Sequence, residues 1–534
     1  MSRLPPLRYL PLLLVSGGAL LTAGLGLLAT PGWFAAAAPL GLLTALGITD
    51  LMQRRRSLRR NYPLLAHLRF ALESIGPEIR QYFIEADTDE RPFSREQRAV
   101  VYQRAKGSLD KRPFGTLLDP YAAGYEWMGH STTSREPADE DFRILVGSTR
   151  AKPFRASVFN ISAMSFGSLS ANATRALNLG ALQGDFYQDT GEGGISRYHL
   201  EAGGDLVWEI GSGYFGCRSV AGGFDADSFA GNAARPAVRM IEIKLSQGAK
   251  PGHGGILPGA KVTDEIAAAR AVPAGQDVIS PAHHSMFSTP GGLLDFVVQL
   301  RELSGDKPVG IKLAIGHPVE WFALVKAMLE RDIVPDFIVV DGAEGGTGAA
   351  PLELINRMGM PVDDAVHLVH NTLRGCGLRG RTRIASAGKV TTAFKLARQL
   401  ALGADWCNAG RGFMFALGCI QSLSCHTDHC PTGIATQDPW RNRSLDPATK
   451  ANRVANFHKH TVRALAQLLD AAGLAHPDEL SANHILRRLP DQRVASFAEL
   501  FPCLPEGALL EGVDYPAPFT EAWKDARSDR FFTA

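Results

Sequence analysis

The pattern of apolar and polar positions separates an apolar N-terminal segment from a long region of short, recurring apolar runs. Tyr9 to Ala29 is about 21 residues without a charge, rich in Leu, Gly and Ala, which is long enough to cross a bilayer core. Pro31-Gly32 interrupts this run, and a second apolar run extends from Trp33 to about Met52. The pattern predicts two membrane-spanning helices, at about 9–29 and 33–52.

Arginines surround these two runs. Five of them lie between Arg54 and Arg60, and Arg3 and Arg8 flank the first run. Because cytoplasmic flanks carry the Lys/Arg excess, we predict a transmembrane hairpin over residues 1–60 with both ends in the cytoplasm. The protein is then a two-pass inner (cell) membrane protein whose catalytic body is cytoplasmic. A cleaved signal peptide is the alternative for the first run alone, but the second run and its arginines disfavour it.

From Ser157 onward, eight short β-branched or apolar runs alternate with helical stretches such as 320–332 and 391–403. The runs are 157–162, 185–189, 205–211, 238–246, 308–316, 336–342, 383–388 and 404–410. Apolar strands that alternate with helices indicate a parallel sheet, and eight such units predict an α/β TIM (β/α)8 barrel over residues 156–438. A doubly wound open sheet is the alternative. In a barrel, functional residues follow the strands.

Two segments flank the predicted barrel. Residues 61–155 are charged and loop-rich, and we expect helices and loops that pack on the barrel. Residues 439–534 are expected to form a mainly helical extension. The formal net charge of +2 gives no reason to expect nucleic acid as a partner.

The loops after the predicted strands carry the candidate chemistry. SAMSFGSLS (162–170) offers small residues that can lie flat against an aromatic ring system, and Glu192 is at the centre of the glycine-rich DTGEGGISRYH (189–199). The loop at 242–262 supplies Lys244, Gln247, Lys250 and Lys261, which suit a small dianionic substrate. Lys312 lies on the fifth strand, where a positive charge could serve a flavin ring.

Glycine-rich turns follow the last two predicted strands, AGK at 387–389 and AGRGF at 409–413. In TIM barrels this is the usual phosphate site, built from backbone NH groups and a helix N-terminus. Lys389 and Arg411 would add positive charge.

Three cysteines are bunched as C-x5-C-x4-C at Cys419, Cys425 and Cys430. Thiolates hold iron–sulfur clusters, and three thiols without a nearby fourth suit a cluster with three protein ligands. Three buried structural cysteines are the alternative. The other four cysteines are scattered, which does not resemble a secreted disulfide framework.

These motifs together resemble the FMN-binding synthase domain of glutamate synthase, over roughly 157–438. The resemblance includes SAMSFGSLS, TGEGG, SQGAKPGHGG, LPGAKV, ISPAHH, DGAEGGTGAAP and the cysteine run followed by CPTGIATQ. It implies a barrel that binds FMN and a 3Fe-4S cluster. The implied cluster ligands are Cys419, Cys425 and Cys430. The implied FMN contacts are Ala163, Met164, Ser165 and Lys312 at the ring and Gly388, Lys389, Gly410 and Arg411 at the phosphate.

The family's reaction condenses 2-oxoglutarate with ammonia, and reduced FMN passes a hydride to the imine carbon. The resemblance implies Glu192 and Lys250 as catalytic residues. It implies Lys244, Gln247, Lys250 and Arg270 as substrate contacts. No strand is followed by a GxGxxG fingerprint, so electrons are expected from a donor such as ferredoxin, a reductase subunit or a membrane carrier. Whether the protein forms a homo-oligomer is left open by the sequence.

Departures from the family pattern leave the substrate open. Position 2 is not cysteine and no amidotransferase domain is evident, so ammonia, an amine or a partner must supply nitrogen. His253 and Ile256 stand where full-length enzymes carry Glu and Gln, and Ile256 cannot hydrogen-bond a carboxylate. The alternatives are an N-methylglutamate synthase-like enzyme, a membrane-linked FMN dehydrogenase, and a non-catalytic scaffold subunit, which the intact cysteines and lysines disfavour.

Overall fold

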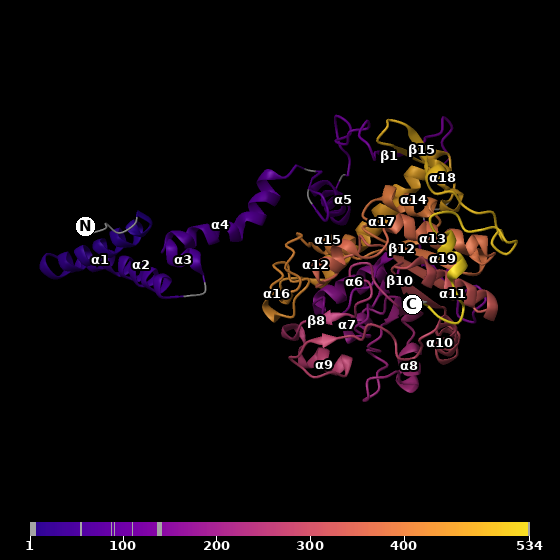
Figure 1. Cartoon of the computed structure of the whole chain (residues 1–534), viewed down its shortest axis with the longest axis horizontal. Helices are drawn as coiled ribbons and strands as arrows, with labels where there is room; N and C mark the ends of the chain where they lie inside the picture. Colours follow the sequence, from indigo (N-terminus) through magenta and orange to yellow (C-terminus); the bar gives the residue numbers. More distant parts are fainter. Residues whose placement is uncertain are drawn as a thin grey trace. The chain divides into compact units, whose positions relative to one another are not determined.

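The computed structural model describes residues 7–531 apart from 54–55, 87, 90, 109 and 136–140. The chain folds as two units, one up to Glu96 and one from Gln97 onward (Figure 1). Arg3, Arg54 and Arg55 of the predicted basic flanks lie outside the described residues.

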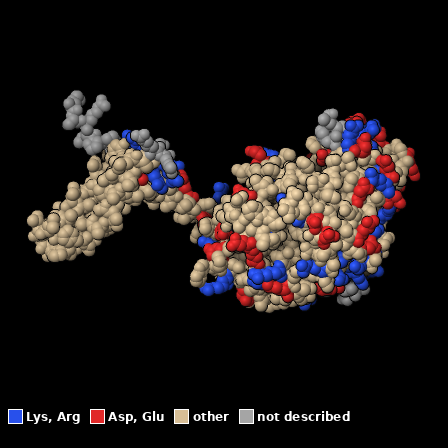
Figure 2. Space-filling view, turned by 90° about the horizontal axis from the view of Figure 1, so that it is seen from below, with Lys and Arg blue, Asp and Glu red and all other residues tan. Residues whose placement is uncertain are grey.

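The first unit begins with two helical segments that are long and apolar enough to cross a membrane, Leu7–Leu28 and Pro31–Met52. They comprise η1 (Leu7–Tyr9), α1 (Leu10–Leu28), η2 (Pro31–Trp33) and α2 (Phe34–Met52). Glycines bring α1 and α2 close together: a Cβ on Gly47 would lie 2.4 Å from Leu12 Cδ1. The predicted pair of helices is confirmed, and its surface carries almost no charged side chains (Figure 2).

Three short elements complete the first unit: α3 (Ser57–Asn61), α4 (Leu65–Ile79) and the π-helical turn η3 (Arg80–Ile84). The carboxylate of Asp50, near the end of α2, lies 2.9 Å from His67 Nε2 and accepts a hydrogen bond from the Leu64 backbone NH at 3.2 Å. These contacts tie the start of α4 to the end of α2.

The second unit contains a closed barrel of eight parallel strands, which confirms the predicted TIM barrel. Each predicted run contains one strand, and the run is longer because its ends enter the loops. The strands in barrel order are β4 (Phe159–Ile161), β5 (Gln188–Asp189), β6 (Leu206–Ile210), β7 (Val238–Lys244), β10 (Val309–Leu313), β11 (Phe337–Asp341), β12 (Arg383–Ala387) and β13 (Trp406–Ala409).

Helices surround the barrel, and several begin with a side-chain cap. Ser170, Thr289 and Thr392 accept hydrogen bonds from backbone NH groups at the starts of α6, α10 and α14. The helices are α6 (Ala171–Gln183), α7 (Arg197–Leu200), α8 (Ala226–Ala233), α9 (Asp264–Arg270), α10 (Pro290–Leu303), α11 (Pro318–Arg331), α12 (Leu352–Arg357), α13 (Val362–Gly375), α14 (Ala393–Ala401) and α15 (Arg411–Leu417), with η4 (Gly259–Lys261) and η5 (Arg379–Arg381) between them.

The segment that leads into the barrel packs on it from two sides. The antiparallel pair β2 (Arg143–Val146) and β3 (Phe154–Ser157) contributes Val146 and Phe154 to a core cluster with Val207, Phe337 and Trp406 of the barrel strands. Helix α5 (Arg95–Lys106) lies beside α17 (Pro447–Ala472), where the Asn456 side chain donates to the Ala105 carbonyl at 3.3 Å.

The C-terminal segment combines helices with a small sheet. Strand β14 (Ile485–Arg488) pairs with β15 (Val494–Ser496) on one side and with β1 (Glu126–Met128) from the lead-in on the other. The local pattern did not show these strands, because each has only three or four residues. The other elements are α16 (Pro439–Arg443), α18 (Phe497–Leu500), α19 (Thr520–Asp525), η6 (Pro477–Glu479) and η7 (Ala482–His484). A last pair, β8 (Ile256–Leu257) and β9 (Val278–Ile279), lies in the loops after β7.

Candidate active site

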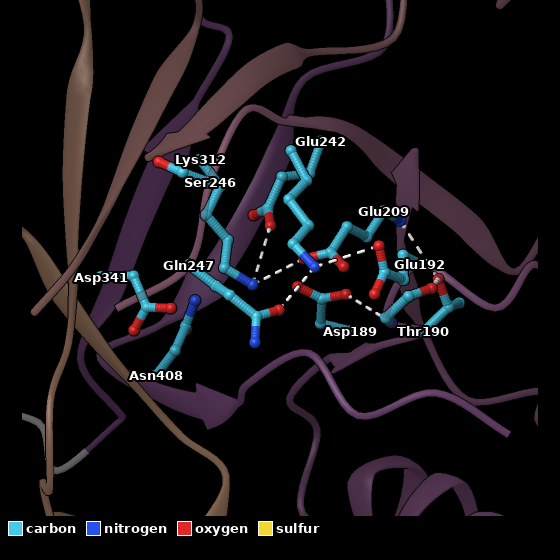
Figure 3. Close-up of polar contacts among 12 residues, drawn as sticks. Asp189, Thr190, Glu192, Glu209, Glu242, Ser246, Gln247, Lys312, Asp341 and Asn408 are labelled. Carbon is cyan, nitrogen blue, oxygen red and sulfur yellow. Dashed lines mark hydrogen bonds and ion pairs between the residues drawn. The ribbon is translucent and has the colours of Figure 1, made fainter. Parts of the chain in front are cut away.

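The loops at the carboxyl ends of β5 and β7 bring the predicted acid and lysines together. Lys244 at the end of β7 lies 3.2 Å from Glu192 Oε2, and its Nζ donates to Gln247 Oε1 at 2.6 Å. Glu192 and Gln247 point into the same space (Figure 3). Lys250 and Arg270 are only 2% and 4% exposed. The structure therefore brings the five side chains together around Glu192, and this group is called the pocket below. Their role in binding a substrate stays a prediction.

Positive charge exceeds negative charge in this pocket. Burial acts to raise the pKa of Glu192, but Lys244, Lys250 and Arg270 outweigh it and hold that pKa below its usual range. Burial lowers the pKa of Lys250 to about 8 and that of Arg270 to about 10, with Glu192 opposing both shifts. Three cations thus face one carboxylate, which leaves two positive charges for an anion to neutralise.

Glycines give Glu192 and Arg270 the space they occupy. A Cβ on Gly255 would lie 1.9 Å from Glu192 Oε1, and one on Gly211 would lie 2.9 Å from Oε2. A Cβ on Gly193 would lie 2.7 Å from Arg270 Nη2. The TGEGG and GHGG motifs therefore allow close packing around the charged groups. Ile256 follows Gly255 directly, so this departure from the family pattern is beside the pocket.

A second charged cluster lies deeper in the barrel. Carboxylate oxygens of Asp189, Glu209 and Glu242 lie within 4.8 Å of one another. Lys312 Nζ is 2.6 Å from Glu209 Oε2 and 3.8 Å from Glu242 Oε1. Figure 3 shows these four side chains pointing toward one another from four neighbouring strands. All four are buried.

Burial and mutual repulsion favour the protonated forms of two carboxyls in this cluster. Burial and the charge of Glu209 raise the pKa of Asp189 to about 7, and burial and Asp189 raise the pKa of Glu242 well above its usual range. Neither carboxylate oxygen of Glu242 accepts a hydrogen bond from a donor among the described residues. A proton shared between neighbouring carboxyls would satisfy them. For Lys312, the surrounding carboxylates outweigh burial and raise its pKa.

Sequence reasoning missed the three acids of this cluster. Glu209 lies in the wholly buried strand β6 and Glu242 in the buried part of β7, and an acidic residue at such a position signals an interior polar group. Lys312 was predicted at the flavin ring. The structure shows its ammonium paired with Glu209, which the sequence did not indicate.

The loops predicted to hold FMN meet at one end of the barrel. Gly191 approaches the loop after β4 so closely that a Cβ on it would lie 2.5 Å from the Ser165 nitrogen. Gly410, after β13, lies beside Met164, since a Cβ placed on Gly410 would be 3.7 Å from the Met164 sulfur. Ala163, Met164 and Ser165 are all partly exposed. The loops after β4, β5 and β13 therefore converge as predicted.

A cluster of cations lies where the phosphate was predicted. Lys389, next to Gly388, adopts a left-handed conformation (φ 51°). Lys395 Nζ donates a hydrogen bond to the Lys389 carbonyl at 3.3 Å. Burial and the neighbouring Lys389 lower the pKa of Lys395 to about 8, and Arg411 adds a further lowering effect. Burial lowers the pKa of Arg411 to about 10. Lys395 is an additional cation that the sequence did not single out.

The three clustered cysteines lie on one tightly curled loop. Gln421, Leu423 and Asp428 on this loop all have positive φ angles. The Tyr102 hydroxyl donates to the Cys419 carbonyl at 2.5 Å. Burial acts to raise the pKa of Cys430, but hydrogen bonds from Thr432 and from backbone NH groups outweigh it and lower that pKa.

Lys261 belongs to this cysteine loop and not to the pocket around Glu192. Its Nζ donates to the carbonyls of Ser168 at 3.1 Å and Cys425 at 3.0 Å. The prediction that groups Lys261 with Lys244 and Lys250 is therefore wrong for its side chain, which points to the cysteine loop although the residue is near them in the sequence.

The chain is similar to several known proteins. Among solved structures, mandelate oxidase with (S)-2-phenylpropionate is 12% identical with a TM-score of 0.42, covering 75% of this chain and 98% of that one. The archaeal glutamate synthase (NADPH) of Methanocaldococcus jannaschii is 38% identical over 325 residues, 60% of each chain. The glutamate synthase large subunit-like protein YerD of Bacillus subtilis (strain 168) is 37% identical over 505 residues, 87% of this chain and 96% of its own length. A family model described as a conserved region in glutamate synthase matches residues 136–475. The chain therefore belongs to the glutamate synthase family of oxidoreductases.

Proposed function

We propose that this protein makes an amino acid by reductive amination of a 2-oxo acid, with FMN and an iron–sulfur cluster as its cofactors. The supporting observation is the pocket in which Lys244, Lys250 and Arg270 surround Glu192 with two positive charges in excess. A 2-oxo dicarboxylate such as 2-oxoglutarate brings two negative charges, so it would neutralise this excess. The cations would orient the substrate, and Glu192 would exchange a proton with the amine nitrogen.

The residues at the open end of the barrel fit FMN. Ala163, Met164 and Ser165 would lie against the ring, while Gly388, Lys389, Gly410 and Arg411, joined by Lys395, would hold the phosphate. The cluster of cations at 389, 395 and 411 suits a phosphate dianion. When bound, FMN would supply the hydride chemistry. Lys312 would place a positive charge near the ring, and its carboxylate partners would buffer that charge.

The cysteine loop fits a 3Fe-4S cluster better than a single zinc ion. Thiolates are the ligands of iron–sulfur clusters, and three thiols on one loop suit a cluster with three protein ligands. Cys419, Cys425 and Cys430 would be these ligands, and the C-x5-C-x4-C spacing differs from the paired CxxC of common zinc sites. Their cluster would relay electrons from ferredoxin, a reductase subunit or a membrane carrier.

Ile256 supports a second candidate substrate. It follows Gly255 in the sequence and stands where full-length enzymes of the family carry Gln, so a hydrogen-bonding side chain is missing at this position. An apolar group at this position would accept an N-methyl group more readily than a carboxylate. An N-methylglutamate synthase-like reaction, with methylamine in place of ammonia, is therefore the second candidate.

We also propose that the first unit attaches the enzyme to the inner membrane, with the barrel in the cytoplasm. The two apolar helical segments support this by length and composition. Arg56, Arg59 and Arg60 follow the second segment, as expected of a cytoplasmic flank.

The first experiment is anaerobic reoxidation of the reduced flavin. The full chain in detergent is reduced with dithionite, and flavin absorbance is followed after adding 2-oxoglutarate with ammonium or with methylamine. Fast reoxidation with glutamate as product supports the first candidate, and faster reoxidation with methylamine supports the second. Protein with bound flavin that is reoxidised by neither mixture would contradict both candidates.

The cofactor proposal has its own test in a matched pair of cysteine variants. Cys425→Ser is expected to lose the electron paramagnetic resonance signal of the cluster and to keep the flavin. Cys503→Ser changes an exposed cysteine and should keep both. A full cluster signal in Cys425→Ser would contradict the ligand assignment.

A further inference from the structure

Helix α4, which follows the hairpin, carries an exposed apolar stripe along its length. Leu65, Leu68, Leu72, Ile75 and Ile79 recur at steps of three or four residues and therefore share one face of the helix. Each of these side chains is between 38% and 62% exposed. Tyr82, Phe83 and Ile84 in η3 continue the exposed apolar surface. A row of exposed large apolar side chains usually marks a surface that another molecule or a membrane covers.

The opposite face of α4 is already occupied within the same unit. Ala66 is buried, and His67 Nε2 lies 2.9 Å from both carboxylate oxygens of Asp50. The guanidinium groups of Arg56 and Arg59 lie 5.1 and 5.3 Å from the centre of the Phe70 ring. The polar side of the helix therefore faces the end of the hairpin, and the apolar stripe faces outward.

The contacts of Asp50 determine where the apolar stripe begins relative to the end of α2. Asp50 lies in the last turn of α2, and the backbone NH of Leu64 donates to it at 3.2 Å. If α2 spans the bilayer, α4 therefore starts at the level of the lipid headgroups. Arg56, Arg59 and Arg60 surround this point, and arginines there attract the anionic headgroups of the cytoplasmic leaflet.

We propose that α4 and η3 lie in the membrane interface, with the stripe from Leu65 to Ile84 facing the acyl chains and the arginines at the headgroups. This inference rests on the proposed membrane attachment. Arg69 and Glu73 form an exposed ion pair at 2.7 Å in the middle of α4. If α4 were a third membrane-spanning helix, these two charges would enter the bilayer core, so α4 lies along the membrane surface instead. The segment is a second, amphipathic attachment beside the hairpin.

Photocrosslinking of the full chain in phosphatidylglycerol-containing nanodiscs tests this inference. Leu72→p-benzoylphenylalanine places a photoreactive group in the stripe, and Ser74→p-benzoylphenylalanine places it on the opposite side of the same helix. Mass spectrometry then identifies what each group captures. We expect lipid adducts several-fold more abundant from position 72 than from position 74. Replacing Leu68 and Ile75 by Glu in the same chain should reduce the adducts at position 72 to the level at position 74.

The possible outcomes separate this inference from the membrane proposal. Leu20→p-benzoylphenylalanine, in the exposed surface of α1, reports on the hairpin alone. Lipid adducts at 20 and 72 support both proposals. Lipid adducts at 20, with capture of a second copy or of the barrel at 72, would overturn the interfacial helix and leave the hairpin standing. An absence of lipid adducts at both positions would overturn both.

Discussion

Two charged groups on the same barrel have opposite balances of charge. In the pocket, Glu192 faces Lys244, Lys250 and Arg270, whereas in the deeper cluster three carboxyls face Lys312 alone. The two groups are adjacent layers, because Glu242 and Lys244 are two residues apart on β7 and point into the barrel together.

The opposite charge balances imply that the charge of each group is neutralised in a different way. The group around Glu192 has an excess of positive charge, which an anion would balance, as in the proposed function. In the second cluster the carboxyls outnumber the ammonium of Lys312, and burial raises the pKa of Asp189 and Glu242, which favours their protonated forms. The same strands thus carry a cationic group and an acidic group, and we interpret the acidic group as a proton store.

The largest effect is expected from removing the cation of the deeper cluster. Lys312→Met leaves three buried carboxyls without their ion pair, and breaking such a pair costs about 3–5 kcal/mol. The free energy of unfolding of flavin-free protein, measured with urea, should therefore fall by about 3–5 kcal/mol. The fall should be smaller at pH 5 than at pH 8, because protonation relieves the repulsion among the three carboxyls. Lys459→Met, at an exposed position on α17, is the matched control. Equal stability of the two variants would contradict the role assigned to Lys312.

The pocket can be tested by removing one of its excess cations. Lys250→Met should lower kcat/KM for the oxo acid by roughly 10- to 100-fold, since a charge-assisted hydrogen bond contributes about 1.5–3 kcal/mol. Flavin content, measured by absorbance after denaturation, should not change. A parallel loss of flavin would move Lys250 out of the substrate pocket.

A smaller effect is expected from filling the space beside Glu192. The Cβ of Gly255→Ala would meet Glu192 Oε1 at 1.9 Å, so the acid or its loop must shift. Such overpacking costs about 1–3 kcal/mol, which would lower both the thermal midpoint and the turnover rate. Gly231→Ala on α8, where a Cβ meets no atom within 4 Å, should leave the turnover rate unchanged and should not lower the thermal midpoint, because alanine favours a helix over glycine. If the two variants behave alike, the close packing at Gly255 is not required.

The smallest effect concerns the pH dependence of stability. Burial and Glu209 raise the pKa of Asp189 from 3.8 to about 7, so the folded state keeps a proton that the unfolded chain releases. The stability from this group is present at low pH and is lost as the pH rises toward 7. Glu209→Gln removes the neighbouring charge and should make the fall in thermal midpoint between pH 5 and pH 8 shallower. Glu511→Gln, at an exposed carboxylate, should keep the original slope, and an unchanged slope in Glu209→Gln would contradict the proton store.

The barrel was predictable because its strands are mostly buried, form apolar runs and are separated by helices. The same regularity brought Glu192, Lys244 and Lys250 together, since they lie at or after the ends of parallel strands.

Asp189, Glu209 and Glu242 were missed because they lie on the strands and not in the loops that carry the motifs. Lys261 was grouped with Lys244 and Lys250 because it is near them in the sequence, but its contacts are with Ser168 and Cys425. The pairing of β1 with β14 joins segments more than 300 residues apart, and neither segment is long enough to indicate a strand by itself.

The hydrogen bond from Tyr102 to the Cys419 carbonyl determines where the chain can be shortened to obtain a detergent-free enzyme for crystallisation. A cut just before Gln97 removes the hairpin and α4 but keeps most of α5, and with it the support of the cysteine loop. A cut only a dozen residues later removes Tyr102 and the contact of Ala105 with Asn456. With the proposed cluster in the cysteine loop, the preparation with the later cut is expected to lose iron during purification, although its barrel and the group around Glu192 are complete.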